Sequence, residues 1–552
     1  MKKLIECVPN FSEGKDSTII NSIAEEIEKI DGVKLLDVDP GKATNRTVIT
    51  FVGTPQAVVE AAFHAIKRAS ELIDMSKHKG EHPRMGATDV CPLIPLSGIT
   101  VEETVRYANQ LAERVGRELG IPVYLYEYAQ PNKERNNLSV IREGEYEGFS
   151  KKIKQPEWKP DFGPSELPVR AGATVIGVRD FLVAYNVNLN TTSVRRANAV
   201  AFDVRERGRV VKDEKGNDVH VPGTLKEVKA IGWYIEEYQQ AQVSMNLTNV
   251  NTTPVHIAFE EVCKSALNRG MRVTGSELVG LIPLQSMLSA GKYFLKKQKR
   301  SVGVSEQELI HIAIKSLGLD DLGEFHPDKK IIEYRMRKDS DSILQNLTVK
   351  AFADMTASES PAPGGGSVSA YLGALGAALG TMVANLSATK KGWESRIDEF
   401  SDWAEKGQVI KDKLVKAVDD DTAAFNRIMT AFGLPKNTDD EKKARKNAIN
   451  QATIAAIEVP YKVMQLSLES MQLIKAMAES GNPNPVTDAG VGALCARSAV
   501  LGAHLNVKIN AGGLSDKSSI QTLLDDAEKI EKQALELETA ILGIVNAVIK
   551  KG

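Results

Sequence analysis

The hydrophobic pattern of the chain changes near His326, and this change constrains the fold more than any other feature of the 552 residues. Before it, short runs rich in β-branched residues, such as 4–8 and 47–52, alternate with helical runs such as 55–73. After it, long runs rich in Ala, Leu and Ile follow one another, and almost nothing is typical of a strand. We therefore predict an α+β part followed by an all-α helical domain.

The α+β part contains two strand–helix series that resemble one another. Leu93-Ile94-Pro95-Leu96 in the first series matches Leu281-Ile282-Pro283-Leu284 in the second, and the order of elements is similar. We predict two related α/β-sandwich subdomains with a cleft between them for a small ligand. The predicted domains are residues 1–178, residues 179–326, a linker at 327–343 and the all-α domain at 344–552.

Charge and cysteine content exclude several classes of protein. Lys and Arg total 70 against 72 Asp and Glu, so no basic excess favours nucleic acid as a partner. The start of the chain has no signal-peptide core, and the uncharged stretch 367–389 is too weakly apolar to predict a membrane span. We predict no metal site and the reduced thiols of a cytoplasmic protein, because no metal-ligand spacing joins Cys7, Cys91, Cys263 and Cys495.

One histidine lies in a loop suited to proton transfer. The string Lys77-His78-Lys79-Gly80-Glu81-His82-Pro83-Arg84-Met85-Gly86 falls between a helix and a strand. Its glycines and proline fix an irregular backbone, and its Lys and Arg side chains suit an anionic substrate beside the His82 imidazole. A solvated surface histidine is the alternative, and spacing alone favours that alternative.

Two further segments are candidates for ligand contacts. Asp37 and Asp39 alternate along a strand, so both point to one face, and Asn45 and Arg46 follow them. They form either a ligand-facing polar edge or a solvated strand end. The segment 158–172 (WKPDFGPSELPVRAG), rich in proline and glycine, is either a plain linker or a loop that lines the cleft.

The helical domain contains one aspartate at a core position. In the helix predicted at 393–432, apolar residues at 410, 414, 418, 425 and 428 follow steps of three and four that include Asp421. A carboxylate on an apolar face is paired, has a raised pKa or lines a cavity, and each case makes it a candidate for acid/base catalysis. A purely structural pairing with a neighbouring helix is the alternative.

Two helix starts complete the candidates in this domain. Gly364, Gly365 and Gly366 precede Ser367 at a helix start, where exposed backbone N–H groups can bind an anion or a ring carbonyl. Asp488 lies at another helix start, where an N-terminal cap is the favoured interpretation.

Strings along essentially the whole chain match one known family. The first part holds ECVPNFSEG at 6–14, LLDVD at 35–39, TNRT at 44–47, GEHPRMG at 80–86, DVCP at 89–92 and IGWY at 231–234. The helical domain holds APGGGS at 362–367, VDDD at 418–421 and LPKNT at 434–438. Together these strings resemble the formimidoyltransferase-cyclodeaminase family, the bifunctional folate enzymes of histidine breakdown.

The resemblance implies two reactions and assigns residues to them. A formimino group moves from N-formimino-L-glutamate to N5 of tetrahydrofolate, with His82 as the residue that transfers the proton. N10 then attacks the formimino carbon, ammonia leaves and 5,10-methenyltetrahydrofolate forms, with Asp421 as the proton donor and acceptor. The resemblance also implies folate or substrate contacts by Asp39, Asn45, Arg46, Arg84, Gly163, Pro164, Ser165, Gly172, Gly364, Gly365, Gly366, Ser367 and Asp488.

The resemblance further implies polyglutamylated tetrahydrofolate as the substrate, and self-association into a ring of dimers, a homo-octamer. The stretch 207–224 departs from the family as a longer charged turn, for which we expect no catalytic effect. The alternatives are a protein with one live activity, whose other domain serves assembly or folate binding, and a folate-binding scaffold without turnover.

Overall fold

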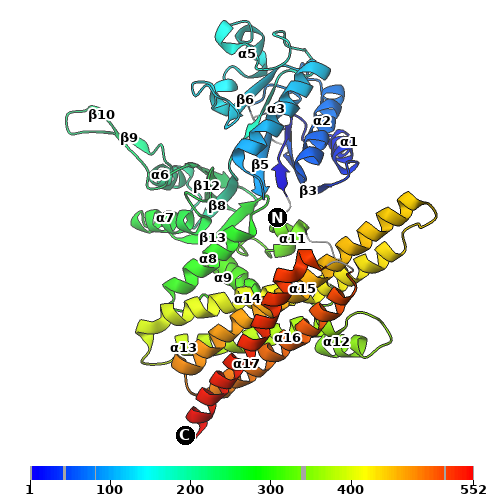
Figure 1. Ribbon diagram of the computed structural model, residues 1–552. Coiled ribbons are helices and arrows are strands. Elements are labelled where there is room, and N and C mark those ends of the chain that lie inside the picture. Colours follow the sequence, from blue (N-terminus) through cyan, green and yellow to red (C-terminus); the bar gives the residue numbers. More distant parts are fainter. Residues whose placement is uncertain (1–2, 42–44, 81–82, 337–342, 515–516, 551–552) are drawn as a thin grey trace. The chain divides into compact units, whose positions relative to one another are not determined.

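The computed structural model describes residues 3–41, 45–80, 83–336, 343–514 and 517–550. It contains two compact units, Met1–Ser286 with Leu317–Met336, and Met287–Ser316 with Arg337–Gly552. The first unit contains strands and helices, and the second unit is helical over its described residues (Figure 1). The predicted fold class, two α/β subdomains and an all-α domain, is confirmed.

A seven-stranded mixed sheet organises the first subdomain. Its strand order is β1-β4-β2-β5-β7-β6, and β3 pairs with β4. These strands are β1 (Leu4–Cys7), β2 (Asn10–Phe11), β3 (Val33–Gly41), β4 (Arg46–Gly53), β5 (Thr88–Ser97), β6 (Val123–Glu127) and β7 (Thr174–Val178). The helices are α1 (Ser17–Glu28), α2 (Pro55–Leu72), α3 (Val101–Glu118), α4 (Leu138–Ile141) and α5 (Glu145–Lys152).

Buried side chains of β1 and β4 form the main core of this subdomain with those of α1, α2 and α3. The sequence also fixes where α3 begins, because Thr100 and Glu103 form a capping box at its first turn. The opposite face of the sheet contributes Leu36 and Val52 to a smaller cluster with Leu281 and Ile332.

An antiparallel four-stranded sheet of order β11-β12-β8-β13 organises the second subdomain. Its elements are β8 (Val183–Leu189), α6 (Val194–Val204), β11 (Val228–Ile235), β12 (Gln240–Leu247), α7 (Val255–Asn268) and β13 (Val273–Val279). Two short helices, α10 (Pro327–Lys330) and α11 (Ile332–Met336), return to this unit. The repeated tetrapeptides occupy different positions: the first lies within β5, whereas the second follows β13, where Gly280 turns the chain with φ +78°.

The stretch 207–224 forms a two-stranded ribbon of β9 (Arg209–Lys212) and β10 (Asp218–Val221). Its side chains are largely exposed, and those of Val210 and Val219 are among them.

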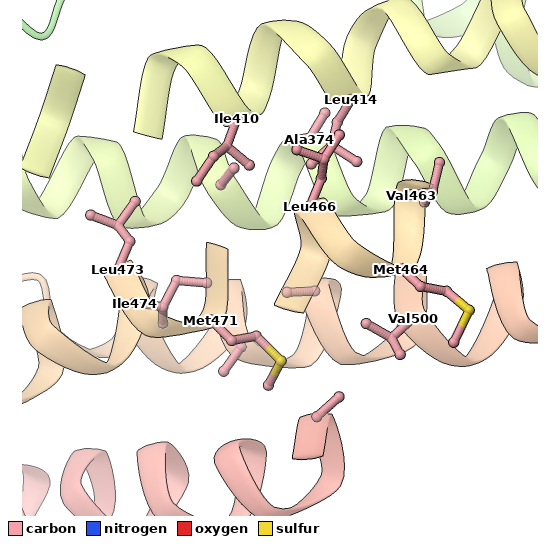
Figure 2. Packing of buried hydrophobic residues seen from close by; sticks show 14 of the residues in the cluster. Ala374, Ile410, Leu414, Val463, Met464, Leu466, Met471, Leu473, Ile474 and Val500 are labelled. Carbon is pink, nitrogen blue, oxygen red and sulfur yellow. The ribbon is translucent and has the colours of Figure 1, made fainter. Parts of the chain in front are cut away.

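Five long helices that share one buried core make up most of the second unit. They are α13 (Gly365–Ala388), α14 (Ile397–Phe432), α15 (Asp439–Ser480), α16 (Val486–Gly512) and α17 (Gln521–Ile549). The other helices of this unit are α8 (Leu284–Lys297) and α9 (Glu306–Leu317), which have a small cluster of their own, and the short α12 (Val349–Thr356). Figure 2 shows part of this core, with Ile410 and Leu414 near Ala374, and Leu466 and Val500 packed nearby.

Small residues let α13 approach its neighbours closely. A Cβ on Gly373 would lie 2.5 Å from Ser467 Oγ, so a larger side chain would push α13 and α15 apart. Among the described residues, α13 alone is long and apolar enough to span a membrane, but 61% of that apolar window is buried inside the protein. Burial of this extent is typical of a core helix.

Helices α8 and α9 and the loop between them pack on the helical domain. The Asn385 side chain donates to Gly303 O at 2.9 Å, and Val302 N donates to Ser401 Oγ at 2.8 Å. Lys292 pairs with Glu405 at 2.5 Å. These contacts explain why Met287–Ser316 belongs to the helical unit.

Candidate active sites

In the first subdomain, the histidine loop at 77–86 lies against the end of the loop at 158–172. Gly86 and Gly172 form an antiparallel bridge, and Ala87 N donates to Ala171 O at 2.8 Å. Gly172 has φ +69°, and a Cβ there would lie 2.3 Å from Met85 O. Only glycine permits this approach, so the fold brings together two segments that are far apart in sequence.

Asn45 joins a third segment to the same loop. Its side chain accepts from Gly14 N at 3.1 Å and donates to Lys79 O at 2.9 Å. Its own carbonyl oxygen lies 2.9 Å from His78 Nε2. Because Asn45 adopts a left-handed conformation with φ +49°, its backbone and its side chain both reach the loop.

Two other residues predicted to contact the ligand, Asp39 and Arg46, lie on β3 and β4. Asp39 pairs with Val48 across these strands and has an exposed side chain. Arg46 begins β4, where burial lowers the pKa of its guanidinium to about 10 while the charge of Asp89 opposes that shift. Asp39 near the end of β3 and Arg46 at the start of β4 therefore both lie close to Asn45, which directly precedes β4.

Arg84 holds the histidine loop against α5. Arg84 is 8% exposed, and its guanidinium donates to Glu145 at 2.8 Å and to Glu147 at 2.6 and 2.9 Å. It also donates to His78 Nδ1 and to His78 O, each at 3.3 Å. The carboxylates of Glu145 and Glu147 thus offset the charge of Arg84. The guanidinium, which was predicted to contact the ligand, here binds side chains and backbone of the protein.

The remaining predicted residues of this subdomain take separate positions. His82 lies outside the described residues. Gly163 has φ +85° and packs against Gly116, and a Cβ on it would lie 2.5 Å from Ile121 O. Pro164 and Ser165 are exposed in the loop that continues to Gly172. Their contacts with a folate stay predictions.

In the helical domain, Asp421 lies beside the first turn of α13. Its Oδ2 accepts from the Ser367 hydroxyl at 3.1 Å, and the carboxylate also accepts the Ser367 backbone N–H. The same hydroxyl lies 2.9 Å from Val418 O and 3.3 Å from Thr422 Oγ1. One serine therefore holds the carboxylate and a full turn of α14 in place.

Opposing effects set the charge state of Asp421. Burial raises the pKa of its carboxyl, whereas the two hydrogen bonds from Ser367 lower it, and the net direction is upward. A raised pKa makes the carboxyl easier to protonate, which suits a group that gives and takes a proton. The core-facing stripe predicted from the sequence accounts for this burial, since Ile410, Leu414 and Val418 are buried along α14.

The glycines before α13 make room for this carboxylate. Gly364 is the N-terminal cap residue of α13, and Gly365 and Gly366 form its first turn. A Cβ on Gly366 would lie 2.1 Å from Asp421 Oδ1, whereas one on Gly365 would make an ordinary contact of 3.5 Å with Asn506 Nδ2. Gly366 thus permits the approach of Asp421.

Asp488 lies away from this group within one chain. It occupies the first turn of α16, eighteen positions before Asn506 on the same helix. At 1.5 Å per residue the two are about 27 Å apart. The structure therefore brings together Asp421, Ser367 and the glycines, but not Asp488.

Within the described ranges, no cluster of three His, Cys, Asp or Glu side chains could hold a metal ion.

Comparison with known proteins covers both parts of the chain. A model of the formiminotransferase domain's N-terminal subdomain matches residues 4–179, one of the formiminotransferase domain matches 184–337, and one of formiminotransferase-cyclodeaminase matches 348–529. The formimidoyltransferase-cyclodeaminase of Gallus gallus is 44% identical over 550 residues, which cover 98% of this chain and 99% of that relative. The chain belongs to the formimidoyltransferase-cyclodeaminase family.

Two further relatives each match one part of this member of the formimidoyltransferase-cyclodeaminase family. A glutamate formimidoyltransferase of Streptococcus pyogenes is 42% identical over 296 residues, covering 54% of this chain and 94% of the relative. A methenyltetrahydrofolate cyclohydrolase of Methylorubrum extorquens is 38% identical over 204 residues, covering 37% of this chain and 98% of the relative. Each part of the bifunctional chain therefore resembles a separate enzyme.

Three residues beside the candidate sites of this family member were not predicted from its sequence. Thr422 shares the Ser367 hydroxyl, Asn506 faces Gly365, and His78 links Asn45 to Arg84. Thr422 directly follows Asp421 in the sequence, and this adjacency is the local signal that it offers. No local sequence pattern points to Asn506, because Gly365, which it faces, lies 141 positions away in the sequence.

Proposed function

We propose that this protein catalyses two successive reactions on one folate, as the formimidoyltransferase-cyclodeaminases of histidine degradation do. The α/β part transfers the formimino group from N-formimino-L-glutamate to tetrahydrofolate. The helical part converts 5-formimidoyltetrahydrofolate to 5,10-methenyltetrahydrofolate and ammonia. The match of almost the whole chain to the relative of that name supports both activities, as do the part-length matches.

In the first reaction, N5 of tetrahydrofolate attacks the formimino carbon and the bond from that carbon to the glutamate nitrogen breaks. His82 takes up the proton that N5 loses and gives a proton to the departing nitrogen, so that glutamate leaves as a neutral amine. Support comes from the loop that carries His82, which is fixed on both sides by Asn45, Arg84 and Gly172. Fixed loop ends favour a defined position for a proton-transferring side chain.

In the second reaction, N10 attacks the formimino carbon, and the nitrogen of that group leaves as ammonia. Asp421 accepts the N10 proton as a carboxylate and gives a proton to the leaving nitrogen as a carboxylic acid. The observation that carries this assignment is the half-buried carboxylate of Asp421, held by Ser367 at the start of α13. The N–H groups of Gly365 and Gly366 in that first turn suit the ring carbonyl of the pteridine.

The finer properties of the substrate and its setting belong to the same proposal. The folate is tetrahydrofolate in its polyglutamylated form, and the protein works in the cytoplasm without a metal ion. The four cysteines are free thiols, which supports a reducing compartment.

The protein also self-associates, as a ring of dimers that makes a homo-octamer. Support comes from a stripe on α16 whose exposed members Val491, Leu494, Leu505 and Ile509 lie within a narrow arc of the helix. Water-exposed apolar stripes of this kind are typical of interaction surfaces. If a second copy packs its α16 on this stripe, the Asp488 that this helix carries lies next to the first copy.

Paired variants test the two-site assignment. His82→Ala is expected to abolish transfer while supplied 5-formimidoyltetrahydrofolate still cyclises, and Asp421→Ala is expected to do the opposite. Methenyltetrahydrofolate absorbance and free ammonia are measured together, because release of ammonia separates cyclodeamination from the cyclohydrolase reaction named for the Methylorubrum relative. Loss of both reactions in either folded variant contradicts the assignment. Absence of one reaction in the wild type favours the alternative of a single live activity.

A further inference from the structure

Arg142 is a largely buried arginine whose hydrogen-bonding capacity the protein satisfies only in part. It directly follows α4, and its side chain is 14% exposed. Among the described residues, its guanidinium donates one side-chain hydrogen bond, from Nη2 to Oδ2 of Asp89, and its buried Nε has no partner. Because a guanidinium carries five N–H donors, most of them are available to another acceptor.

Arg84, in the same subdomain, shows how a structural arginine is satisfied here. Its guanidinium donates to the carboxylates of Glu145 and Glu147, and to the ring and the backbone of His78. Burying a charge is costly unless the charge is paired and hydrogen-bonded. The single bond of Arg142 is therefore more typical of a group that completes its contacts with a ligand.

A second arginine faces the same carboxylate. Arg46, at the start of β4, lies close enough that the charge of Arg142 lowers its pKa and the charge of Asp89 opposes this effect. Asp39 also opposes it, but from an exposed side chain that water screens. Two partly buried guanidiniums thus share the buried carboxylate of Asp89, which leaves an excess of positive charge. An anion beside both arginines relieves their repulsion.

Lys152 holds the backbone that carries Arg142. Its ammonium donates to three backbone oxygens on both sides of Arg142, at 2.7, 3.0 and 3.1 Å. These oxygens belong to Val140, Ile141 and Glu143. The same ammonium lies 3.9 Å from the centre of the Trp158 ring, where the loop at 158–172 begins. The backbone of Arg142 is therefore fixed before a ligand arrives, which lowers the entropic cost of binding.

Asp89 connects Arg142 to the histidine loop at 77–86. Its Oδ1 accepts the backbone N–H of Met85 at 3.0 Å, and its Oδ2 accepts from Arg142. One carboxylate thus bridges the loop and the guanidinium. A ligand bound to Arg142 is held beside the segment on which the proposed transfer depends.

The formimino donor has the chemistry that these arginines recognise. N-formimino-L-glutamate carries two carboxylates, one on the carbon that bears the departing nitrogen and one at the end of the side chain. The planar fork of a guanidinium matches a carboxylate through two parallel hydrogen bonds. The other substrate, tetrahydrofolate, reacts at N5 of a ring that carries no carboxylate, and its own carboxylates lie at the far end of the molecule.

We infer that Arg142, together with Arg46, binds a carboxylate of N-formimino-L-glutamate, and that Asp89 positions Arg142 for this contact. The inference rests on the proposed transferase activity. Arg142 contacts a carboxylate and not the reacting carbon, so its loss should lower the affinity for the donor more than the rate of the chemical step.

The test varies the arginine and the donor in the full-length protein, with initial rates of transfer as the measurement. Arg142→Gln removes the proposed contact. Arg114→Gln is the matched control, because Arg114 is a partly buried arginine that pairs with Glu60 on α2. We expect Arg142→Gln to raise KM for N-formimino-L-glutamate about tenfold and to leave KM for tetrahydrofolate unchanged. Arg114→Gln is expected to change neither constant.

Two donor analogues identify the carboxylate that is bound. N-formimino-4-aminobutyrate lacks the α-carboxylate, and N-formimino-L-glutamine lacks the charge of the γ-carboxylate. With the wild type, the analogue that lacks the bound group should show a KM about tenfold above that of N-formimino-L-glutamate, and Arg142→Gln should raise that KM no further. Arg142→Lys keeps the charge without the fork, so an intermediate KM is expected, and this variant tests the same contact if Arg142→Gln does not fold.

Several outcomes overturn the inference. An unchanged KM for the donor in Arg142→Gln, an equal rise for all three donors, or equal effects of the Arg142 and Arg114 variants shows that Arg142 does not bind the donor carboxylate. A rise in KM for tetrahydrofolate in place of the donor shows that Arg142 serves the other substrate. Absence of transfer by the wild type instead refutes the proposed transferase activity, and the inference that rests on it falls with it.

Discussion

The Ser367 hydroxyl lies 3.1 Å from Oδ2 of Asp421 and joins the first turn of α13 to the middle of α14. Through this contact an acidic side chain is held in a largely apolar bundle without a cationic partner among the groups that shift its pKa. The result is a carboxyl whose raised pKa is set mainly by burial.

Replacing Asp421 by asparagine should remove cyclisation while keeping the fold. The amide keeps the shape of the side chain but cannot take up or release the proton, so we expect a loss of about 10²–10⁴-fold in rate. The measurement is methenyltetrahydrofolate absorbance from supplied 5-formimidoyltetrahydrofolate. Asp420→Asn is the matched control, because Asp420 pairs with Lys416 at the surface. Equal losses in both variants argue against a special role for Asp421.

Adding one methyl group at Gly366 should impair cyclisation more than stability. The new Cβ meets the end of the Asp421 side chain at 2.1 Å, so the carboxylate moves away and the backbone changes little. We expect Gly366→Ala to lose most of its cyclisation and to lower the melting temperature by only a few degrees. Gly365→Ala, whose Cβ makes an ordinary contact, should retain activity. A larger loss of cyclisation in Gly365→Ala than in Gly366→Ala contradicts this placement of Asp421.

Glu6 should make the stability of the protein depend on pH. Its side chain is 2% exposed, its Oε2 has no partner among the described residues, and burial raises its pKa to about 7 despite the opposing charge of Arg179. Below about pH 4.5 the carboxyl is protonated in both the folded and the unfolded protein. As the pH rises, the unfolded chain ionises first, so stability is lost until the pH passes the folded pKa near 7.

Glu6→Gln removes that ionisation and should abolish this loss of stability. We expect the variant to gain on the wild type between about pH 4.5 and 7, by up to about 3 kcal/mol. Thermal denaturation across this range measures the difference, with the exposed Glu113→Gln as control. A difference that does not change with pH shows that the pKa of Glu6 is not raised in the folded protein.

Loss of the Arg84 side chain should weaken transfer and leave cyclisation intact. Without the contacts to Glu145, Glu147 and His78, the loop loses about 1–2 kcal/mol of local stability. Because His82 needs a defined position, we expect kcat/KM of the transferase to fall about tenfold or more in Arg84→Ala. Arg117→Ala, at an exposed site of the same subdomain, should show no such fall. An unchanged transferase in Arg84→Ala shows that this anchor is dispensable.

Charges on the exposed face of α16 should reduce self-association. Leu505 and Ile509 are 67% and 73% exposed, and lysines there would have to be desolvated in an interface. Sedimentation of Leu505→Lys with Ile509→Lys is expected to show smaller assemblies than the wild type. Val349→Lys, a similarly exposed apolar site on α12, should leave the assembly unchanged. Unchanged assembly in the double variant removes α16 from the interface.

Local sequence patterns were sufficient for part of this description. The change of hydrophobic period near His326 predicted the α+β and all-α parts, because helices and strands each repeat at their own short period. The same periodicity along α14 places Asp421 among the core-facing positions of the helix. The weakly apolar stretch 367–389 did not predict a membrane span, and the structure shows it as α13, largely buried in the helical domain.

Contacts between distant segments were not available from those patterns. The bridge of Gly86 to Gly172 and the contact of Ser367 with Asp421 join residues 86 and 54 positions apart. The distance of Asp488 from Asp421 follows from which end of α16 meets the start of α13. Periodicity says which face of an element is buried, but not which other element covers it.

By itself, the sequence of this protein determined the types of its elements, the face that each element buries and the family strings it carries. Tertiary structure alone decided that Ser367 holds Asp421, that Asn45 and Arg84 anchor the histidine loop, and that Asp89 joins Arg142 to that loop. The physical reason is that local interactions and tertiary packing act over different distances along the chain. Hydrogen bonding and helix period act over a few neighbouring residues, whereas a site is assembled by packing between elements whose partners the local pattern does not name.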